Sequence, residues 1–198
     1  MNRVKEIQEN FQKYGTEKRH MGYEPLYAEI DKTTVKNILE VGVSAGQSLV
    51  SWLELFPYAQ IYGIDIETFD QNIHHWPKDN GQPVFNFSLL AHPRIKIIDK
   101  QNILTFNVGN LNTTFDLIID DASHIPEEQV ATFKRLWPFL NKEGWYIIED
   151  VYLLKRQEPL LKLTDIDIFE TLKEYGIFNL RDITTNQEVA GRLIVARK

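Results

Sequence analysis

The chain has 198 residues, of which 43% are hydrophobic, so it can bury one sizeable core, and we expect a single domain over residues 1–198. A net charge of −6 argues against a nucleic-acid partner, and the absence of cysteine excludes disulfides and thiolate metal sites. Because we find neither a signal-peptide core at the start nor an uncharged apolar run of membrane-spanning length, we expect a cytoplasmic protein that binds small molecules or proteins and no membrane.

Helices and strands are predicted to alternate along most of the chain. Val4, Ile7, Phe11 and Tyr14 recur at helical spacing before Gly15, which predicts an N-terminal helix. Short apolar runs predict five buried strands, with a helix after the first and another after the fourth. The strands are residues 36–42, 60–66, 94–99, 115–121 and 144–150, and the helices are residues 45–57 and a stretch from Pro126 whose apolar stripe ends at Leu140.

The pattern changes towards the end of the chain. Residues 165–176 predict a helix, and residues 177–185 and 191–198 predict two strands joined by a turn around Asn186. The polar stretch 67–93 has no clear period, so we interpret it as an elaborated loop. Strands that alternate with helices predict a parallel sheet. The predicted fold class is therefore α/β, a Rossmann-like open, mainly parallel seven-stranded sheet with an antiparallel C-terminal hairpin and helices on both faces.

The first strand leads into a glycine turn of the kind that binds nucleotides. Gly42 permits a tight turn, and the helix that follows offers free backbone N–H groups. The GxGxxG pattern of dinucleotide sites is incomplete, since Ser44 replaces its second glycine, and Glu40 adds a negative charge that suits a cationic ligand. Asp65 ends the second strand 19 residues after Gly46, a distance at which a carboxylate can bind ribose hydroxyls. These features favour S-adenosylmethionine, and a bare turn glycine with a surface aspartate is the alternative.

Four of the five predicted strands end in a carboxylate, which places these acids at one edge of a parallel sheet. If the fourth and fifth strands are neighbours, Asp121 lies about 5 Å laterally from Glu149 and Asp150. Carboxylates so close repel one another unless a cation lies between them. An all-oxygen set favours a hard ion such as Mg²⁺, with Ca²⁺ or Mn²⁺ as alternatives. The other interpretation is that these acids cap helices or are solvated at the strand ends.

A histidine follows the fourth strand by three residues. Taken alone, His124 would more often be a surface or capping residue than a catalyst. Beside a metal and a cofactor it becomes a candidate general base, because histidine accepts a proton from a hydroxyl near neutral pH. Within the loop 67–93, His74, His75 and Trp76 could form part of a lid or an acceptor wall, and an ordinary surface loop is the alternative.

Four segments in order resemble a known enzyme family: "ILEVGVSAG", "YGIDI", "FDLIIDDASH" and "GWYIIEDV". Together they resemble the class I S-adenosylmethionine-dependent methyltransferases, and in particular the Mg²⁺-dependent sugar O-methyltransferases of macrolide and other natural-product glycosylation. The segment "KYGTEKRHMGYEPLYAEI" is similar to one that precedes the first strand in this group. The resemblance covers residues 13–151 and rests on the motifs together, since any one of them alone is weak.

The resemblance implies a role for each matching residue. His124 would be the general base, and the segment that contains Lys18 and His20 lies over the cofactor in relatives. The implied metal ligands are Asp121, Glu149 and Asp150. The implied cofactor-binding residues are Glu40, Gly42, Ser44, Gly46, Asp65, Asp99, Gln101, Asp120, Tyr14 and Thr16.

The activity that the resemblance implies is methyl transfer from S-adenosylmethionine to a sugar hydroxyl of a small-molecule acceptor, with Mg²⁺ or another hard divalent ion. We leave self-association open. Two departures from the family stand out. Ala122 replaces the glycine of the usual DDGSH motif, which should fit unless that position requires a positive φ. We also see no separate N-terminal domain such as the larger macrolide enzymes carry, so acceptor binding is expected to differ.

Three other functions stay open. An NAD-dependent oxidoreductase is opposed by the incomplete glycine pattern and by the carboxylate-rich site. A catechol-type or other small-molecule O-methyltransferase is also metal-dependent, but a catechol-type enzyme would show an Asp-Asn pair where this chain has Glu149 and Asp150. A non-catalytic nucleotide-binding protein is opposed by the intact set of candidate ligands and base. Cofactor and metal dependence would separate these functions.

Overall fold

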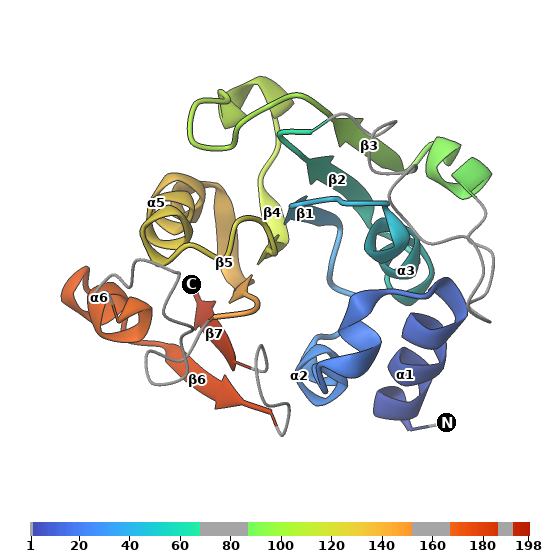
Figure 1. Cartoon of the computed structure of the whole chain (residues 1–198), viewed down its shortest axis with the longest axis horizontal. Coiled ribbons are helices and arrows are strands. Elements are labelled where there is room, and N and C mark those ends of the chain that lie inside the picture. The colour runs from blue at the N-terminus through green and yellow to red at the C-terminus, as the bar shows by residue number, and fades with distance from the viewer. Residues whose placement is uncertain (1, 68–86, 152–166, 186–191) are drawn as a thin grey trace, which may run out of the picture.

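The computed structural model describes residues 2–67, 87–151, 167–185 and 192–198, which form one sheet with helices on both sides (Figure 1). The strand order is β3-β2-β1-β4-β5-β7-β6. The first five strands in that order pair in parallel, whereas β7 pairs antiparallel with both β5 and β6. The strands are β1 (Asn37–Val41), β2 (Gln60–Ile64), β3 (Ile95–Ile98), β4 (Phe115–Asp120), β5 (Leu140–Ile148), β6 (Leu180–Thr184) and β7 (Arg192–Arg197).

Helices cover both faces of this sheet (Figure 1). The helices on one face are α1 (Arg3–Tyr14), α2 (Glu24–Glu29) and α3 (Gln47–Leu55), and those on the other are α5 (Pro126–Leu136) and α6 (Ile168–Glu174). Successive strand residues point to opposite faces, so Ile118 and Ile119 of β4 belong to two different apolar cores. Both cores therefore pack against the same strands, and these strands hold the residues at their ends in place.

The predicted fold class is confirmed, including the antiparallel hairpin at the end of the chain. The N-terminal helix ends as predicted, because Gly15 adopts a left-handed φ of 70° and its N–H bonds back to the carbonyl of Gln12. The predicted extent of the helix after Pro126 is wrong, since Leu140 begins β5 instead of ending that helix. Pro138 has no N–H to donate, so the regular helix cannot continue to Leu140.

Several parts of the sequence interpretation are extended or left untested by the structure. The helix α2 was not predicted, and within the stretch 67–93 residues Phe87–Ala91 form a 3₁₀ turn. The proposed turn at Asn186 and the proposed acceptor wall at 74–76 lie outside the described residues. The single domain over residues 1–198 stays a prediction. Across the described segments, no helix has the length and apolar composition needed to cross a bilayer.

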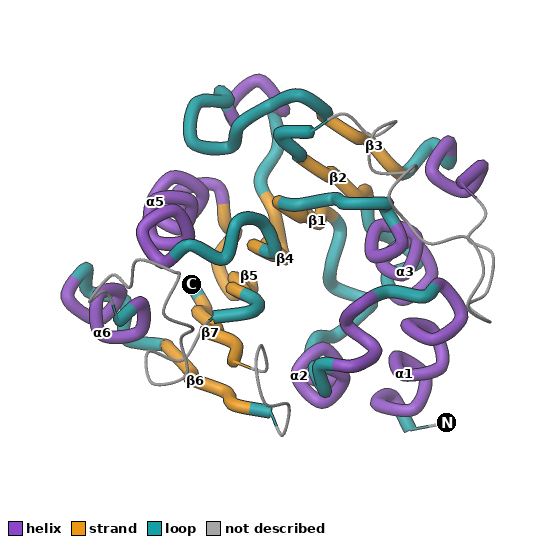
Figure 2. Tube along the Cα trace, in the orientation of Figure 1, coloured by secondary structure: helices purple, strands orange, loops and turns teal. Residues whose placement is uncertain are grey.

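Three neighbouring strands end in register at the edge where the sheet carries its acids. Val41 at the end of β1 pairs with Asp120 of β4, and Asp120 in turn pairs with Ile148 of β5. Because the strands are parallel and in register, the next residues along them also lie close together; these are Gly42, Asp121 and Glu149. The segments after β1 and β4 remain loops until α3 and α5 begin, as Figure 2 shows.

Candidate functional site

The turn after β1 lies directly against the end of β4. Gly42 has a φ of 89°, and a Cβ placed on it would lie only 2.1 Å from the carbonyl oxygen of Asp121. The N–H of Asp121 donates to the carbonyl of Val41 at 2.9 Å, so the two backbones are fixed next to one another. Glycine is required at this position for both its φ and its lack of a side chain. Gly42 thereby brings the loop that carries Asp121 to the nucleotide turn.

Asp65, at the end of β2, holds the same turn from the other side. Its Oδ2 accepts hydrogen bonds from the N–H groups of Val43 at 2.8 Å and Ser44 at 3.0 Å. Its Oδ1 accepts from the N–H of Glu67 at 2.9 Å. Ser44 has a φ of 49°, which is unusual for a residue with a side chain, and these hydrogen bonds stabilise that conformation. Asp65 thus shapes the cavity, and its carboxylate oxygens keep lone pairs for a ligand.

Two cavities open at this edge of the sheet and share Gly42, Ser44, Asp121 and Ala122. The first, of about 240 Å³, lies towards the N-terminal segment and includes Thr16 in its wall. The second, of about 350 Å³, lies over β2. Other residues that line the second cavity are Asp65, Glu67, Gln101, Asn102, Ile103 and Leu104. The two cavities therefore adjoin one another at the four residues that they share.

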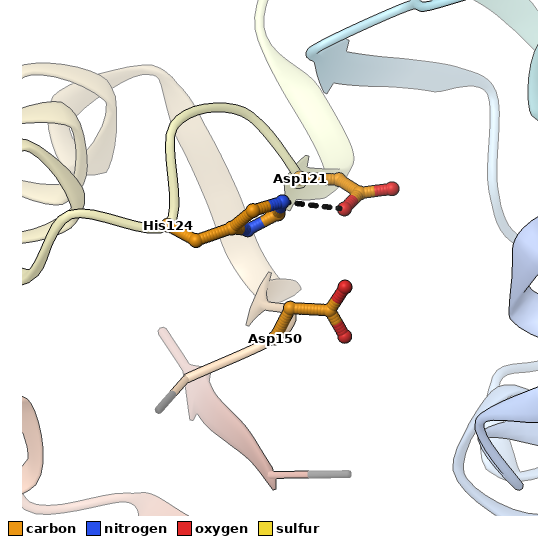
Figure 3. Close-up of side chains that lie close together, drawn as sticks. All are labelled: Asp121, His124 and Asp150. Carbon is orange, nitrogen blue, oxygen red and sulfur yellow. Dashed lines mark ion pairs between the residues drawn. The ribbon is translucent and has the colours of Figure 1, made fainter. Parts of the chain in front are cut away.

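Asp121, His124 and Asp150 point towards one another at the wall of the first cavity (Figure 3). One ligand atom from each lies within 4.8 Å of the others, and Nε2 of His124 is 4.0 Å from Oδ1 of Asp121. His124 and Asp150 have positive φ values of 57° and 51°, so the backbone is held in an uncommon conformation where these side chains meet. Two carboxylates and an imidazole in this arrangement can bind a divalent cation.

A buried lysine contacts Asp121 on the side away from His124. Lys18 is 4% exposed, and its Nζ is 2.5 Å from Oδ2 of Asp121 and 3.4 Å from Oε1 of Glu40. Nζ also donates to Oε2 of Glu149. Burial alone would lower the pKa of Lys18, but the carboxylates of Asp121 and Glu149 raise it well above its usual value. The side chain is therefore an ammonium ion, and the site contains a cation of its own.

Two tyrosine hydroxyls complete the contacts at the end of β5. Tyr27 donates to Oε1 of Glu149, and Tyr23 donates to Oδ1 of Asp150. Because Lys18 occupies Oε2, both oxygens of Glu149 are engaged by the N-terminal segment. Burial raises the pKa of Glu149, an effect that Lys18 opposes. Glu149 therefore faces the N-terminal segment, and it is not one of the three residues that point towards one another in Figure 3.

The structure brings many of the predicted site residues to the cavity walls. Ala122 is not among the described residues with a positive φ, so alanine fits where the family pattern has glycine. Gly46 is the N-cap residue of α3 and has a φ of 82°. The predicted residues that line at least one cavity are Thr16, Gly42, Ser44, Asp65, Gln101, Asp121, His124, Glu149 and Asp150.

Besides Gly46, four predicted cofactor residues line neither cavity. Oε2 of buried Glu40 accepts from Ser48 at 2.8 Å and from the indole of Trp52 at 3.0 Å. The hydroxyl of Tyr14 lies 2.5 Å from Oε2 of Glu54, near the surface. Both side chains stabilise the packing of the N-terminal segment and α3.

The other two are Asp99 and Asp120. Asp99 follows β3 and is exposed. Asp120 is 1% exposed and belongs to the face of β4 opposite to that of Ile119. Burial, together with the charge of Asp121, raises its pKa well above the usual value. The roles of these residues in cofactor binding stay predictions.

Sequence reasoning gave no specific role to several residues that the structure places at the site. Lys18, Tyr23 and Tyr27 lie more than 100 residues before the residues at the ends of β4 and β5 that they contact. Ile103 and Leu104 supply the apolar wall of the second cavity. Their only sequence signal is their place just after β3, because apolar residues in a loop are otherwise common.

The sequence also matches known proteins. Residues 39–151, more than half of the chain, match the family model described as "Methyltransferase domain". The chain belongs to this methyltransferase family. The matched span begins within β1 and ends just after Asp150, so it includes the glycine turn and the acidic strand ends. The N-terminal segment that carries Lys18 lies outside it.

Two relatives of this chain are O-methyltransferases, according to their names. One is the 8-demethyl-8-(2-methoxy-alpha-L-rhamnosyl)-tetracenomycin-C 3'-O-methyltransferase of Streptomyces olivaceus, 29% identical over 66% of this chain and 31% of the relative. The other is the mycinamicin VI 2''-O-methyltransferase of Micromonospora griseorubida, 31% identical over 58% of this chain and 27% of the relative. The chain thus spans about a third of the length of these relatives.

A solved structure supports the same fold. The MycE methyltransferase in complex with Mg, SAH and mycinamycin VI matches with a TM-score of 0.67 and 22% identity, over 96% of this chain and 54% of MycE. A likeness at this identity concerns the arrangement of helices and strands. The seven-stranded architecture of this chain is therefore that of the methyltransferase fold.

Proposed function

We propose that this chain is an S-adenosylmethionine-dependent O-methyltransferase that modifies a sugar hydroxyl of a small-molecule acceptor with the help of a divalent cation. The observation that carries the proposal is the meeting of two cavities at Gly42 and Asp121, beside the group formed by Asp121, His124 and Asp150. A cofactor that extends across both cavities would place its methyl group near that group of residues, where an acceptor hydroxyl could meet it. Membership of the methyltransferase family supports the cofactor.

The residues of the second cavity fit the adenosine half of the cofactor. Asp65 and Glu67 offer carboxylate oxygens for ribose hydroxyls, and Ile103 and Leu104 offer an apolar surface for an adenine ring. In the first cavity, the hydroxyl oxygen of Thr16 is buried and makes no hydrogen bond. A buried hydroxyl without a partner is costly, so a ligand atom that bonds to it would be favoured. The polar methionine end of the cofactor fits this position.

The donor set at the first cavity fits a hard or borderline divalent cation. Asp121 and Asp150 would hold it, since they belong both to the predicted ligand set and to the observed group. When bound, Mg²⁺ or a similar ion would lower the pKa of an acceptor hydroxyl and stabilise the developing alkoxide.

The reaction would exchange one bond for another. A new bond joins the acceptor oxygen to the methyl carbon while the bond from that carbon to the cofactor sulfur breaks, and the hydroxyl proton passes to a base. Nε2 of His124 is placed to accept this proton, because it lies in the cavity wall and faces Asp121. The walls of the two cavities hold the partners at reacting distance, which contributes much of the rate acceleration.

The acceptor class rests on the relatives. The names of the two relatives above refer to a rhamnosyl group on tetracenomycin and to mycinamicin VI. We propose a sugar-containing small molecule for this chain as well. The hydroxyl that is methylated and the oligomeric state stay open.

The first experiment is a calorimetric titration of metal-stripped protein with S-adenosylhomocysteine, with NAD as a comparison, followed by a methyl-transfer assay on glycosylated polyketides read by mass spectrometry. Binding of the homocysteine compound without binding of NAD, and a mass gain of one methyl group that EDTA abolishes, are expected. Binding of NAD alone would refute the proposal and favour the oxidoreductase alternative. Methyl transfer that EDTA leaves unchanged would refute the role of the cation.

A further inference from the structure

Another cavity opens beside the candidate site, between α2 and the antiparallel end of the sheet. Its volume is about 460 Å³, which is more than that of either cavity described above. Pro25 and Leu26 of α2 line one side, and Ile183 of β6 lines the other. β6 is the last strand at this edge of the sheet (Figure 1). We call this space the α2–β6 cavity, and the chemistry proposed above uses none of the residues that line it.

The floor of the α2–β6 cavity is aliphatic. Leu26 and Leu193 are 3% and 0% exposed and belong to one apolar core, and Ile183 packs against that core from the edge strand. The charged residues of the wall are Arg181 and Glu29, which neutralise one another through two hydrogen bonds of 2.5 Å and 2.9 Å. A concave surface with an apolar floor and no net charge suits an uncharged ligand that is largely apolar.

The α2–β6 cavity begins where the first cavity ends. Gly22 lines the α2–β6 cavity, whereas its chain neighbours Met21 and Tyr23 line the first cavity. Gly22 is exposed and has a φ of 71°, and a Cβ placed on it would point towards Thr185, 3.5 Å from the Cβ of that residue. Because position 22 carries no side chain, the two cavities are separated there by backbone alone. Tyr23 in turn donates to Oδ1 of Asp150, so this junction lies beside the reacting group.

Thr185 offers a hydrogen bond at this junction. Its hydroxyl oxygen is buried and makes no hydrogen bond to the described part of the chain. A buried hydroxyl without a partner is costly, so a polar ligand atom that reached it would be bound favourably. From Gly22 the wall continues to Glu29, seven residues further along, or roughly 10 Å at the rise of a helix. The α2–β6 cavity therefore offers a polar entrance and a longer apolar floor.

We propose that the α2–β6 cavity binds the apolar, non-sugar part of the acceptor while a hydroxyl of the attached sugar lies at Asp121, His124 and Asp150. The acceptor would pass over Gly22, and Thr185 would bond to a polar atom near the link between the sugar and the rest of the molecule. This inference rests on the proposed function, because it places the remainder of the molecule that is methylated. It makes the substrate class a glycoside with an uncharged apolar group, in preference to a free sugar or a sugar phosphate.

The test follows methyl signals by nuclear magnetic resonance in the full chain, saturated with S-adenosylhomocysteine and Mg²⁺. The probe is 8-demethyl-8-alpha-L-rhamnosyl tetracenomycin C, a compound in the name of a Streptomyces olivaceus relative, and methyl α-L-rhamnoside is the sugar-only comparison. The tetracenomycin compound should shift the signals of Ile183 and Leu26, and the methyl rhamnoside should shift neither. Leu180 of β6 is the internal control, because it packs against the core on the other face of the sheet.

Two substitutions separate a binding role from a structural one. Ile183→Trp fills the cavity with a residue that suits a strand, and calorimetry should show about ten-fold weaker binding of the tetracenomycin compound. Asn179→Trp is the matched control, since Asn179 is exposed just before β6 and lies outside the cavity wall. Thr185→Val removes the hydroxyl and keeps the shape of the side chain. It should weaken binding about three-fold or more without lowering the melting temperature, because no hydrogen bond within the described chain is lost.

The outcomes distinguish this inference from the proposed function. If S-adenosylhomocysteine does not bind, the proposed function is refuted and the inference falls with it. If it binds but the tetracenomycin compound shifts neither Ile183 nor Leu26, the inference alone is overturned. Equal shifts by the methyl rhamnoside, or equal weakening by Asn179→Trp, would also overturn it. Circular-dichroism melting identifies variants that unfold, and Pro25→Trp, at an exposed position of the opposite wall, fills the cavity if Ile183→Trp does not fold.

Discussion

Replacement of Gly42 by alanine tests whether the close contact between the glycine turn and the end of β4 builds the cofactor site. The added Cβ would lie 2.1 Å from the carbonyl oxygen of Asp121, about 1.3 Å short of the 3.4 Å at which ordinary van der Waals contact begins. It would also lie 2.7 Å from the carbonyl carbon of Asp121 and 2.9 Å from the Cα of Ala122. All three atoms belong to the backbone, so no side-chain rotation can relieve the overlap.

The expected cost has two parts. A left-handed φ costs a residue with a Cβ about 1–2 kcal/mol, and an overpacked site costs about 1–3 kcal/mol more. Gly176→Ala is the matched control, because Gly176 has a similar φ of 80° but its Cβ would meet its nearest neighbour, in Phe178, only at 4.0 Å. Gly42→Ala should therefore lower the free energy of unfolding by about 1–3 kcal/mol more than the control does.

The assay is urea unfolding followed by circular dichroism, paired with calorimetric titration by S-adenosylhomocysteine. Without urea, where the variant is folded, Gly42→Ala should bind S-adenosylhomocysteine at least about ten-fold more weakly. The reason is that the loop of Asp121 must move away from the turn. Gly176→Ala should bind like the unmodified chain. Equal destabilisation of the two variants, with unchanged binding by Gly42→Ala, would refute the reasoning.

Three further predictions follow from contacts at and near the site. His124→Asn should bind S-adenosylhomocysteine and Mn²⁺ normally while methyl transfer falls by about 10²-fold or more, whereas a loss of Mn²⁺ affinity would identify His124 as a ligand instead of a base. Asp65→Ala should weaken S-adenosylhomocysteine binding by about ten-fold or more in calorimetry, because two backbone N–H groups of the turn lose their acceptor; unchanged affinity would exclude this role. The hydrogen bonds from Arg181 lower the pKa of Glu29 below its usual value of 4.5. This half-exposed pair therefore stabilises the fold at pH values above 4.5, and its contribution is lost as the pH falls through the lowered pKa. Glu29→Gln should thus cost about 0.5 kcal/mol of unfolding free energy near neutral pH and nothing in acid, and a difference that persists in acid would contradict the ion-pair account.

The arrangement of the parallel part of the sheet could be predicted because its five strands are short apolar runs that are followed by a glycine or an acid. The residues at the strand ends also located Asp121 and Asp150, since parallel strands bring their carboxyl ends to one edge of the sheet. Asp120 shows where the same reasoning was incomplete. It precedes Asp121 on a strand, and adjacent strand residues face opposite sides, so only one of the two can point into a given cavity.

The contacts of Lys18, Tyr23 and Tyr27 with the strand ends could not be predicted from the local sequence. In the sequence, Lys18 looks like an ordinary surface lysine. The residues next to it do not indicate that carboxylates from the ends of β1, β4 and β5 surround it. Tyr23 and Tyr27 precede the sheet and show no pattern that distinguishes a hydroxyl donor from a packed aromatic ring. The direction of a side chain such as Glu149 depends on these long-range partners, which strand periodicity does not report.

The bonds from the N-terminal segment to the strand ends have a consequence for the order of folding. Lys18 is 131 residues from Glu149, and Tyr27 is 122 residues from it. Contacts between positions so far apart in the chain close late, because a long loop must lose its freedom before they form. During synthesis, α1 and α2 emerge well before β4 and β5, so Lys18 has only Glu40 as a carboxylate partner until most of the chain has been made. Binding of S-adenosylhomocysteine should accordingly be gained in the last kinetic phase of refolding, after the secondary structure has formed.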